Sequence, residues 1–202
     1  GYLGMVIPEP YGGSGAPVIQ GTILLEEVAR VCFNTALVAQ IALNGPSRAL
    51  AVLASEEQKQ RWLPGCAKGD YNFAIGISAP GAGSGMTDMI ASATPDGAHI
   101  VLNGQKAYCT GGHLASHIFV FARWGQTQGP RGIGALVVER GMKGFEVGHP
   151  DRKMGGRGMP EVELYFDHCR VPMQNVILAG DPDSTRSFKR LMSSFGPERV
   201  GN

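Results

Sequence analysis

The sequence has little net charge, few cysteines and no long apolar run. Its 18 basic and 17 acidic residues leave a formal net charge of +1, so no overall field attracts nucleic acid or an anionic membrane. No stretch has the length and composition of a transmembrane helix, and no signal peptide is visible. The four cysteines lack the close spacing of a metal-binding motif; they are Cys32, Cys66, Cys109 and Cys169. We therefore expect reduced thiols, no metal, no membrane span and no nucleic-acid partner.

The residues that are present suit a folded protein with a loop-rich β region. A chain of 202 residues that is 43% hydrophobic can bury a substantial core. Its 30 glycines and 13 prolines are spread along the chain and do not form a low-complexity tract. The chain opens at Gly1 without a start methionine and reaches Asn202 in a helical pattern. We therefore interpret it as a fragment truncated at both ends.

The first 70 residues read as helical. Prolines and glycines predict an ordered loop over residues 2–15. From Thr22 onward, apolar residues at helical spacing predict one amphipathic helix; they are Leu24, Leu25, Val28, Val31, Cys32, Ala36 and Ala39. A second helix is expected to begin at Pro46, and a third at the capping-box pattern Ser55-Glu-Glu-Gln58. Because proline disrupts helix interiors, the third helix is expected to end before Pro64.

After Asp70 the hydrophobic period changes from helical to strand-like. The predicted strands are Tyr71–Ser78, His99–Leu102, Ser116–Arg123, Gly134–Glu139 and Val162–Phe166, separated by turns such as Pro95-Asp-Gly97 and Asn103-Gly104. Short strands without intervening helices favour an antiparallel barrel or sandwich over a Rossmann fold. Helical character returns over Ser184–Ser194. The predicted fold class is α+β, with a helical domain (1–70), a β domain (71–180) and the start of a second helical domain (181–202).

The segment Gly81-Ala-Gly83-Ser-Gly85 suggests close approach to a phosphate. It does not match the Rossmann fingerprint, because position 86 is methionine and no helix is evident there. Glycines without a Cβ let backbone amides and the Ser84 hydroxyl come near a phosphate or pyrophosphate. Taken alone, the same residues also suit an ordinary glycine-rich turn.

Two segments resemble the flavin-holding segments of the acyl-CoA dehydrogenase family. Ser78-Ala-Pro-Gly-Ala-Gly-Ser-Gly85 is similar to the family's Thr-Glu-Pro-Gly-Ala-Gly-Ser-Asp, and Lys106-Ala-Tyr-Cys-Thr-Gly-Gly112 to Lys-x-Trp-Ile-Thr-Asn-Gly-Gly. Further similar segments occur in the expected order at residues 6–13, 25–30, 56–64, 153–158 and 166–172. The resemblance covers nearly the whole chain.

The resemblance implies an FAD site in the β domain. Its residues are Ile75, Ile77, Ser78, Gly83, Ser84, Tyr108, Cys109 and Thr110. Ser78 is expected to bind the flavin pyrimidine ring, the Gly83–Ser84 region to lie near pyrophosphate and substrate, and Thr110 to hydrogen-bond flavin N5. Ala79, Gly85, Tyr108 and Gly111 depart from the family pattern, which suggests an outlying subfamily with altered substrate or chemistry.

The reaction implied by the resemblance needs a carboxylate that removes the α-proton of an acyl thioester while a hydride passes to flavin. Glu198 stands where some members carry this base, and Arg199 follows it where many members retain an arginine near CoA. Two alternatives stay open. Glu198 can equally be a helix-start carboxylate favoured by the dipole, and the base can lie in a C-terminal region that the sequence does not include.

Other polar residues carry weaker signals. The basic residues Arg152, Lys153 and Arg157 could meet an anionic cofactor, although such a cluster is more often a solvated loop. His113 has no partner at catalytic spacing and is expected to be structural or solvent-facing. His168 and Cys169 are neighbours on a predicted strand, so they should face opposite sides.

The implied function is acyl-CoA dehydrogenation in fatty acid metabolism, with electrons passed to an electron-transfer flavoprotein. The resemblance further implies a homodimer or homotetramer in the cytoplasm, or in the mitochondrial matrix if the source is eukaryotic. Two alternatives stay open: a flavin-dependent monooxygenase or oxidase on the same fold, and a non-catalytic subunit of a hetero-oligomer. The fragment alone is expected to be inactive and to hold flavin weakly.

Overall fold

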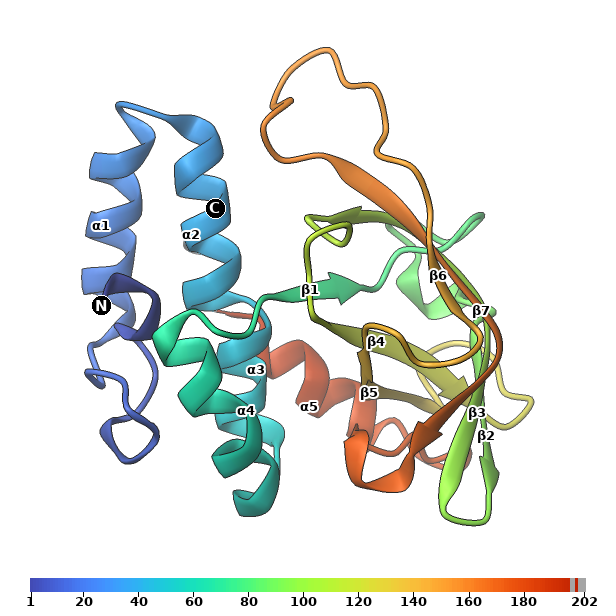
Figure 1. The fold of residues 1–202 in the computed structure, drawn as a ribbon. Helices are drawn as coiled ribbons and strands as arrows, with labels where there is room; N and C mark the ends of the chain where they lie inside the picture. The colour runs from blue at the N-terminus through green and yellow to red at the C-terminus, as the bar shows by residue number, and fades with distance from the viewer. Residues whose placement is uncertain (197–198, 200–202) are drawn as a thin grey trace.

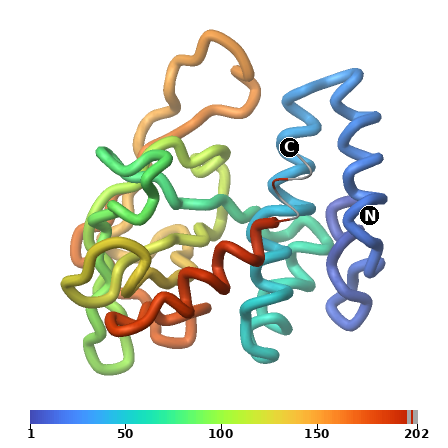
Figure 2. Tube along the Cα trace, turned by 180° about the vertical axis from the view of Figure 1, so that it is seen from behind, coloured from blue at the N-terminus to red at the C-terminus, as the bar shows by residue number. Residues whose placement is uncertain are grey.

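The structure is a computed structural model that describes residues 1–196 and Arg199. Its N-terminal part is helical. After two 3-10 turns, Tyr2–Gly4 and Glu9–Tyr11, the described helices of this part are α1 (Val18–Ala29), α2 (Phe33–Asn44), α3 (Pro46–Leu53) and α4 (Glu56–Lys68). Helices α1 and α2 lie side by side and are joined at one end (Figures 1 and 2). The 3-10 turns confirm that residues 2–15 are ordered without a long helix.

The prediction of one helix from Thr22 to Ala39 is wrong, because the chain reverses near Val31. Cys32 is extended, with φ −150° and ψ 104°, and caps α2. The reversal packs Leu25 of α1 and Leu43 of α2 into one apolar cluster with Val6. A single straight helix could not bring Leu25 and Leu43 together, so tertiary packing outweighs the local helical pattern.

Helices α3 and α4 begin where the sequence predicts. Pro46 occupies the first position of α3, and Ser55 caps α4 in a complete capping box with Gln58. The predicted end before Pro64 is wrong, since α4 continues through Pro64 to Lys68. The turn after Pro64 buries Cys66 and Ala67 in the main core, and this packing offsets the roughly 3 kcal/mol cost of an interior proline.

An eight-stranded mixed sheet follows in the described chain. Its strands are β1 (Phe73–Gly76), β2 (Ser92–Asp96), β3 (His99–Thr110), β4 (His117–Trp124), β5 (Ile133–Glu139), β6 (Phe145–Val147), β7 (Glu161–Pro172) and β8 (Val176–Leu178). The order is β6-β7-β3-β2-β4-β5-β8, and β1 pairs with β4.

The α+β class is confirmed, but two details of the predicted β domain are wrong. The sheet is not purely antiparallel, because β1 and β2 each pair with β4 in parallel. The chain reverses twice between β2 and β4, so β1, β2 and β4 share a direction. The sheet also does not close into a barrel in the described chain, since the strand path ends at β6 and β8. It curls enough for side chains of β3 and β7 to share a core with those of β4 and β5.

Strand β3 is three times as long as predicted. It runs for 12 residues, because Asn103-Gly104 is a bulge within the strand and not the predicted turn; Gly104 has φ 127°. Strand β7 likewise extends beyond Val162–Phe166. The short strands β2, β6 and β8 are absent from the sequence-based prediction, since three to five residues give little periodicity.

The core lies on both faces of β4, whose eight residues are all buried. Phe119 and Phe121 belong to the cluster shared with the helices, whereas Ile118 and Val120 belong to the cluster inside the curled sheet. Helix α5 (Arg186–Ser194) confirms the predicted return of helical character and runs from the sheet toward the helical part (Figure 2). The Phe195 ring after α5 lies 5.7 Å from that of Phe121.

The prediction that no stretch has the length and composition of a transmembrane helix is wrong for Phe33–Leu53, which is long and apolar enough to cross a membrane by these two measures. It comprises α2 and α3, which meet at Gly45. More than half of it is buried inside the protein, so its role as a core element accounts for its composition.

Candidate functional site

Three segments converge on a cavity of ≈330 Å³ between α2 and the sheet. Its walls are Leu37, Gln40, Ile41 and Gly45 from the α2 region, Ile75, Ile77 and Ser78 from β1 and the residues after it, and Ala107, Tyr108 and Thr110 from β3. The cavity therefore brings together five of the eight residues predicted to bind FAD. Its size lies at the lower end of the range for small-molecule sites.

Ser78 supplies a polar group at this cavity. Its backbone carbonyl accepts a hydrogen bond from the Ala107 amide at 2.9 Å, while its half-buried hydroxyl has no partner within residues 1–196 or at Arg199. An unpaired hydroxyl in a partly buried position gains by binding a polar ligand atom. Ser78 is thus placed to orient a ligand's polar edge.

The glycine-rich segment forms a tight turn outside the cavity. Ala79 and Ala82 exchange two backbone hydrogen bonds across Pro80 and Gly81, and Gly81 has φ 77°, which glycine adopts without strain. Gly83 and Ser84 are exposed and do not line the cavity. A Cβ built on Gly83 would meet nothing within 4 Å, so the backbone there is open to an approaching group.

A bulge in β3 sets the directions of Tyr108 and Cys109. The pairing with β7 shifts between Lys106 and Cys109, and Tyr108 has the rare φ of 55°. The Tyr108 side chain is 72% exposed at the cavity rim, whereas Cys109 is fully buried inside the sheet. Burial, followed by the charge of Glu161, raises the pKa of the Cys109 thiol to about 12, so this thiol is neither a nucleophile nor a side-chain contact for a ligand.

Thr110 is hydrogen-bonded to a residue that the sequence does not single out. Its hydroxyl donates to Glu161 Oε2 at 2.6 Å. The other carboxylate oxygen of Glu161 lies 3.2 Å from Lys153 Nζ, and Lys153 also donates to the Met159 carbonyl at 2.6 Å. Lys153 is therefore a paired residue and not a solvated cation. Thr110 and Glu161 are 51 residues apart, so only the pairing of β3 with β7 brings them together.

Lys106 is a second polar residue near the site, and it was given no role on the basis of the sequence. It is fully buried, and its amine donates to the Ile77 carbonyl at 2.9 Å and lies 3.8 Å from the Met89 sulfur. Burial, and next the charge of Arg123, lowers the pKa of Lys106 to about 7. Since Ala107 holds the Ser78 carbonyl, consecutive residues of β3 fix consecutive carbonyls of the cavity wall.

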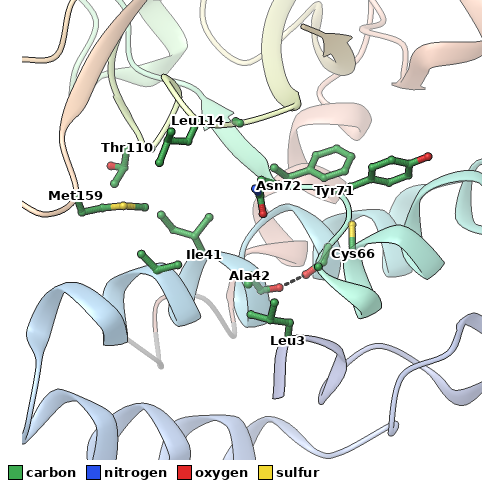
Figure 3. A pocket seen from close by; sticks show the side chains of 15 residues that line it. Leu3, Ile41, Ala42, Cys66, Tyr71, Asn72, Thr110, Leu114 and Met159 are labelled. Atoms are coloured by element: carbon green, nitrogen blue, oxygen red, sulfur yellow. Dashed lines mark hydrogen bonds between the residues drawn. The ribbon is translucent and has the colours of Figure 1, made fainter. Parts of the chain in front are cut away.

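A second, apolar cavity of ≈180 Å³ lies on the other side of Ile41. It shares Ile41 and Thr110 with the first cavity and is closed by residues such as Leu114 and Met159. Figure 3 shows Ile41 of α2 pointing across it toward Thr110 and Met159. The two cavities thus form one largely apolar region between the helical part and the sheet, in which polar groups are few and localised.

The loop over residues 148–160 borders this region. A Cβ built on Gly158 would lie 2.9 Å from the Asn34 side chain at the start of α2. The loop is tied down by Lys153 and by Arg157, whose Nε donates to the Lys153 carbonyl at 3.0 Å. It therefore closes the gap between α2 and the sheet from one side.

The other residues singled out in the sequence lie away from the cavity lining or outside the described residues. Glu198 lies outside the described residues. Arg199 is exposed, and its amide donates to the Phe195 carbonyl at 3.3 Å. His168 is exposed and Cys169 is buried, which confirms that they face opposite sides. In the described part of the chain, no cluster of three or more His, Cys, Asp or Glu residues could hold a metal ion.

The residues at the cavity fit a planar, mostly apolar ligand with a polar edge. The exposed Tyr108 ring offers a flat surface and the isoleucines offer further apolar surface, while Ser78 and Thr110 are the hydroxyl-bearing residues of the lining. The open backbone at Gly83 suits a negatively charged extension of the same ligand. An isoalloxazine ring joined to a pyrophosphate has these properties.

Two family models together match most of the first 169 residues of the chain. The model of the acyl-CoA dehydrogenase N-terminal domain matches residues 1–70, and that of the acyl-CoA dehydrogenase middle domain matches residues 74–169. Among curated relatives, the short-chain-specific acyl-CoA dehydrogenase of Clostridium acetobutylicum is 34% identical over 100% of this chain and 52% of its own length. The mitochondrial isovaleryl-CoA dehydrogenase of Solanum tuberosum is 36% identical over 98% and 47%. The chain thus spans about half the length of the curated relatives it matches.

Solved structures show the same similarity. Butyryl-CoA dehydrogenase from Megasphaera elsdenii has a TM-score of 0.91 at 29% identity, covering 100% of this chain and 52% of its own. A chain in the structure of the electron transferring flavoprotein of Acidaminococcus fermentans has a TM-score of 0.92 at 33% identity, with 100% and 52% covered. A glutaryl-CoA dehydrogenase from Mycobacterium smegmatis in complex with FADH2 has a TM-score of 0.87 at 26% identity, with 100% and 49% covered.

Proposed function

Because the chain belongs to the acyl-CoA dehydrogenase family, we propose that the protein is a flavoenzyme that removes two hydrogens from the α and β carbons of an acyl-CoA thioester. The observation that carries the proposal is the cavity in which Ser78, Tyr108 and Thr110 meet across β1 and β3. These residues come from the two segments that resemble the family's flavin-holding segments.

In the proposal, FAD is the cofactor and, when bound, accepts the hydride. The Ser78 hydroxyl binds the pyrimidine edge of the flavin, and Thr110 binds N5. The exposed backbone at Gly83 and the Ser84 hydroxyl receive the pyrophosphate, where open amides suit an anion. Ile75 and Ile77 border the ring and contribute apolar surface.

The chain's own residues also prepare the site for substrate. The second cavity, which Ile41 of α2 helps to line, is mostly apolar; a bound ligand that fills such a region displaces water, and a dry site strengthens each polar contact within it. Lys106 and Ala107 hold the wall that carries Ser78. We propose Glu198 as the base that takes the α-proton and Arg199 as a contact for CoA; a carboxylate elsewhere in the protein is the alternative base.

The test is to purify the full-length protein and record its visible absorption spectrum. We expect bound FAD at about one per chain, and anaerobic bleaching of its absorption by some members of a panel of acyl-CoAs differing in chain length and branching. Absence of flavin from the purified protein would overturn the proposal and favour a non-catalytic subunit. Rapid reoxidation in air without an added electron acceptor would instead favour a monooxygenase or oxidase.

We further propose that the electrons pass to an electron-transfer flavoprotein and that the protein works as a homodimer or homotetramer. The similarity to a chain from an electron transferring flavoprotein structure supports the first point. All four cysteines are free, which suits a reducing compartment, either the cytoplasm or a mitochondrial matrix. Reduction of added flavoprotein and a measured mass in solution test these points.

A further inference from the structure

We propose that Glu161 is a positioning residue that fixes the Thr110 hydroxyl as a hydrogen-bond acceptor toward the flavin and thereby favours the reduced cofactor. The inference rests on the proposed function, in which Thr110 faces flavin N5. Neither Glu161 nor its pairing with Thr110 belongs to the segments from which that function was predicted.

The geometry commits the only proton of the Thr110 hydroxyl. Thr110 and Glu161 are register partners in the antiparallel pair β3–β7, so the backbone fixes their separation. The donor–acceptor distance is 2.6 Å, the range of a strong hydrogen bond to a charged acceptor. The Glu161 side chain is only 19% exposed, so water competes weakly for its oxygen.

The second carboxylate oxygen of Glu161 is also engaged. Lys153 Nζ lies 3.2 Å from it and is itself held by the Met159 carbonyl at 2.6 Å. This ammonium compensates the carboxylate charge and limits rotation of the Glu161 side chain. The loop that carries Lys153 packs against the start of α2 through Gly158, so the hydrogen bond is supported from both sides of the site.

The hydrogen bond to Glu161 decides what the Thr110 hydroxyl can offer to a flavin. A threonine hydroxyl has one proton and two lone pairs, and an ionised carboxylate can only accept. With its proton on Glu161, the Thr110 oxygen can only accept from a ligand. Oxidised flavin presents a lone pair at N5, whereas reduced flavin presents an N–H there. Thr110 therefore opposes the oxidised form and hydrogen-bonds the reduced form.

The Thr110 hydrogen bond favours reduced flavin, whereas the negative charge of Glu161 by itself favours oxidised flavin. A nearby negative charge disfavours electron uptake, so its removal alone would favour reduced flavin. Release of the Thr110 proton would instead let the hydroxyl donate to N5 and favour oxidised flavin. The sign of the change in a variant therefore separates positioning from simple electrostatics.

The experiment measures the dissociation constants of oxidised and reduced FAD for the full-length protein and its variants. Glu161→Gln keeps the shape and removes the charge; its one amide oxygen faces the Lys153 ammonium, so its NH2 group faces Thr110, donates to the hydroxyl oxygen and leaves the Thr110 proton free. Glu161→Asp keeps the charge but shortens the side chain so that it no longer reaches Thr110. In both variants we expect the ratio of the two constants to move about tenfold toward oxidised FAD, equivalent to about 30 mV in a two-electron potential. Glu163→Gln is the matched control, because Glu163 lies two residues away on β7 and hydrogen-bonds Tyr165 instead; we expect less than a twofold change.

A double variant tests whether Glu161 acts on the flavin through the Thr110 hydroxyl. In a Thr110→Val background, Glu161→Gln should no longer shift the ratio toward oxidised FAD. An unchanged ratio in both single Glu161 variants, or a shift toward reduced FAD in Glu161→Gln, would overturn the positioning role while leaving the proposed function intact. Failure of the unaltered protein to bind FAD in either state would overturn the proposed function, and the inference with it.

Discussion

At the scale of single residues, Lys106 shows how a side chain stabilises a site without touching its ligand. Its amine is fully buried and bonds the Ile77 carbonyl, so it fixes the wall that leads to Ser78. No carboxylate pairs with it in the described chain. Burial lowers its pKa to about 7 because the charged form is poorly solvated.

We predict that this burial makes stability depend on pH. Between about pH 7 and pH 10, unfolded Lys106 binds a proton and the folded residue does not, so the free energy of unfolding rises with pH in this window. Lys106→Met should remove this contribution, which is on the order of 4 kcal/mol at about 1.4 kcal/mol per pKa unit. Urea unfolding at several pH values measures the slope.

The exposed Lys143 provides a matched control. Lys143→Met should leave the pH dependence of stability unchanged. A slope that is the same in Lys106→Met as in the unaltered protein would show that Lys106 is protonated to the same extent in both folding states.

A second prediction at this scale concerns Glu198, the proposed base. A base in a water-excluded thioester pocket should have its pKa raised toward neutrality, which lets it accept the α-proton. Glu198→Gln cannot accept the proton, so the rate of flavin reduction in stopped-flow experiments should fall at least about a hundredfold while FAD and CoA still bind.

The alternative, in which Glu198 is only a carboxylate favoured by the helix dipole, predicts a different result. A helix-start carboxylate would cost about 0.3–1 kcal/mol of stability when neutralised and leave the rate nearly unchanged. An unaltered rate in Glu198→Gln would assign the base to another carboxylate.

At the scale of an element, α4 joins the helical part to the sheet. Gln58 completes the capping box, and its Nε2 donates to the carbonyls of Gln174 and Val176 at 2.9 and 2.8 Å. One side chain therefore both starts the helix and ties it to β8. Farther along, Pro64 interrupts the backbone ladder of α4 without ending the helix, which leaves the Gln60 carbonyl without its usual helical donor.

We predict that Pro64→Ala raises the free energy of unfolding by about 1–3 kcal/mol, because it restores the backbone hydrogen bond and removes the steric clash of the proline ring. The greater freedom of the unfolded chain offsets part of the gain. Denaturant midpoints at constant slope measure the change.

Pro130, in the loop between β4 and β5, gives the contrasting variant. Pro130→Ala should lower stability by about 0.4–1 kcal/mol, since it only frees the unfolded chain. If Pro64→Ala were also destabilising, the proline in α4 would have to be a stabilising feature of the helix.

At the scale of the whole molecule, a polar cluster links the helical part to the sheet. Arg61 of α4 lies 2.7 Å from Glu139 Oε1 at the end of β5 and donates to Asn175 Oδ1 at 3.0 Å. The buried Asn175 amide donates to the carbonyl of Val137 and to Glu139, both at 3.0 Å. This cluster fixes how α4, and with it the helical wall of the cavity, lies against the sheet.

We predict that Asn175→Ala lowers the free energy of unfolding by about 1–3 kcal/mol, because it leaves the buried Val137 carbonyl unpaired. Arg61→Ala should cost less, at most about 1 kcal/mol, since its ion pair with Glu139 is partly exposed. A double-mutant cycle measured by urea unfolding gives their coupling. A larger cost for Arg61→Ala than for Asn175→Ala would contradict this ranking.

The sequence alone predicted the features that depend on interactions between residues close in the chain. The capping box at Ser55 and the helix start at Pro46 depend on neighbours within a few residues, and both are confirmed. The predicted turn Pro95-Asp-Gly97 is confirmed at Gly97 only, since Pro95 and Asp96 belong to β2. The paired glycine-rich and threonine-containing segments were enough to recognise the family, because those residue types at that separation are specific.

Tertiary structure decided the features that depend on distant partners. Packing of Leu25 on Leu43 turned one predicted helix into two, and burial beyond Pro64 carried α4 past its expected end. The pairings Thr110–Glu161 and Lys106–Ile77 join residues 51 and 29 positions apart. No periodicity encodes them, since they arise only when strand register brings the side chains together.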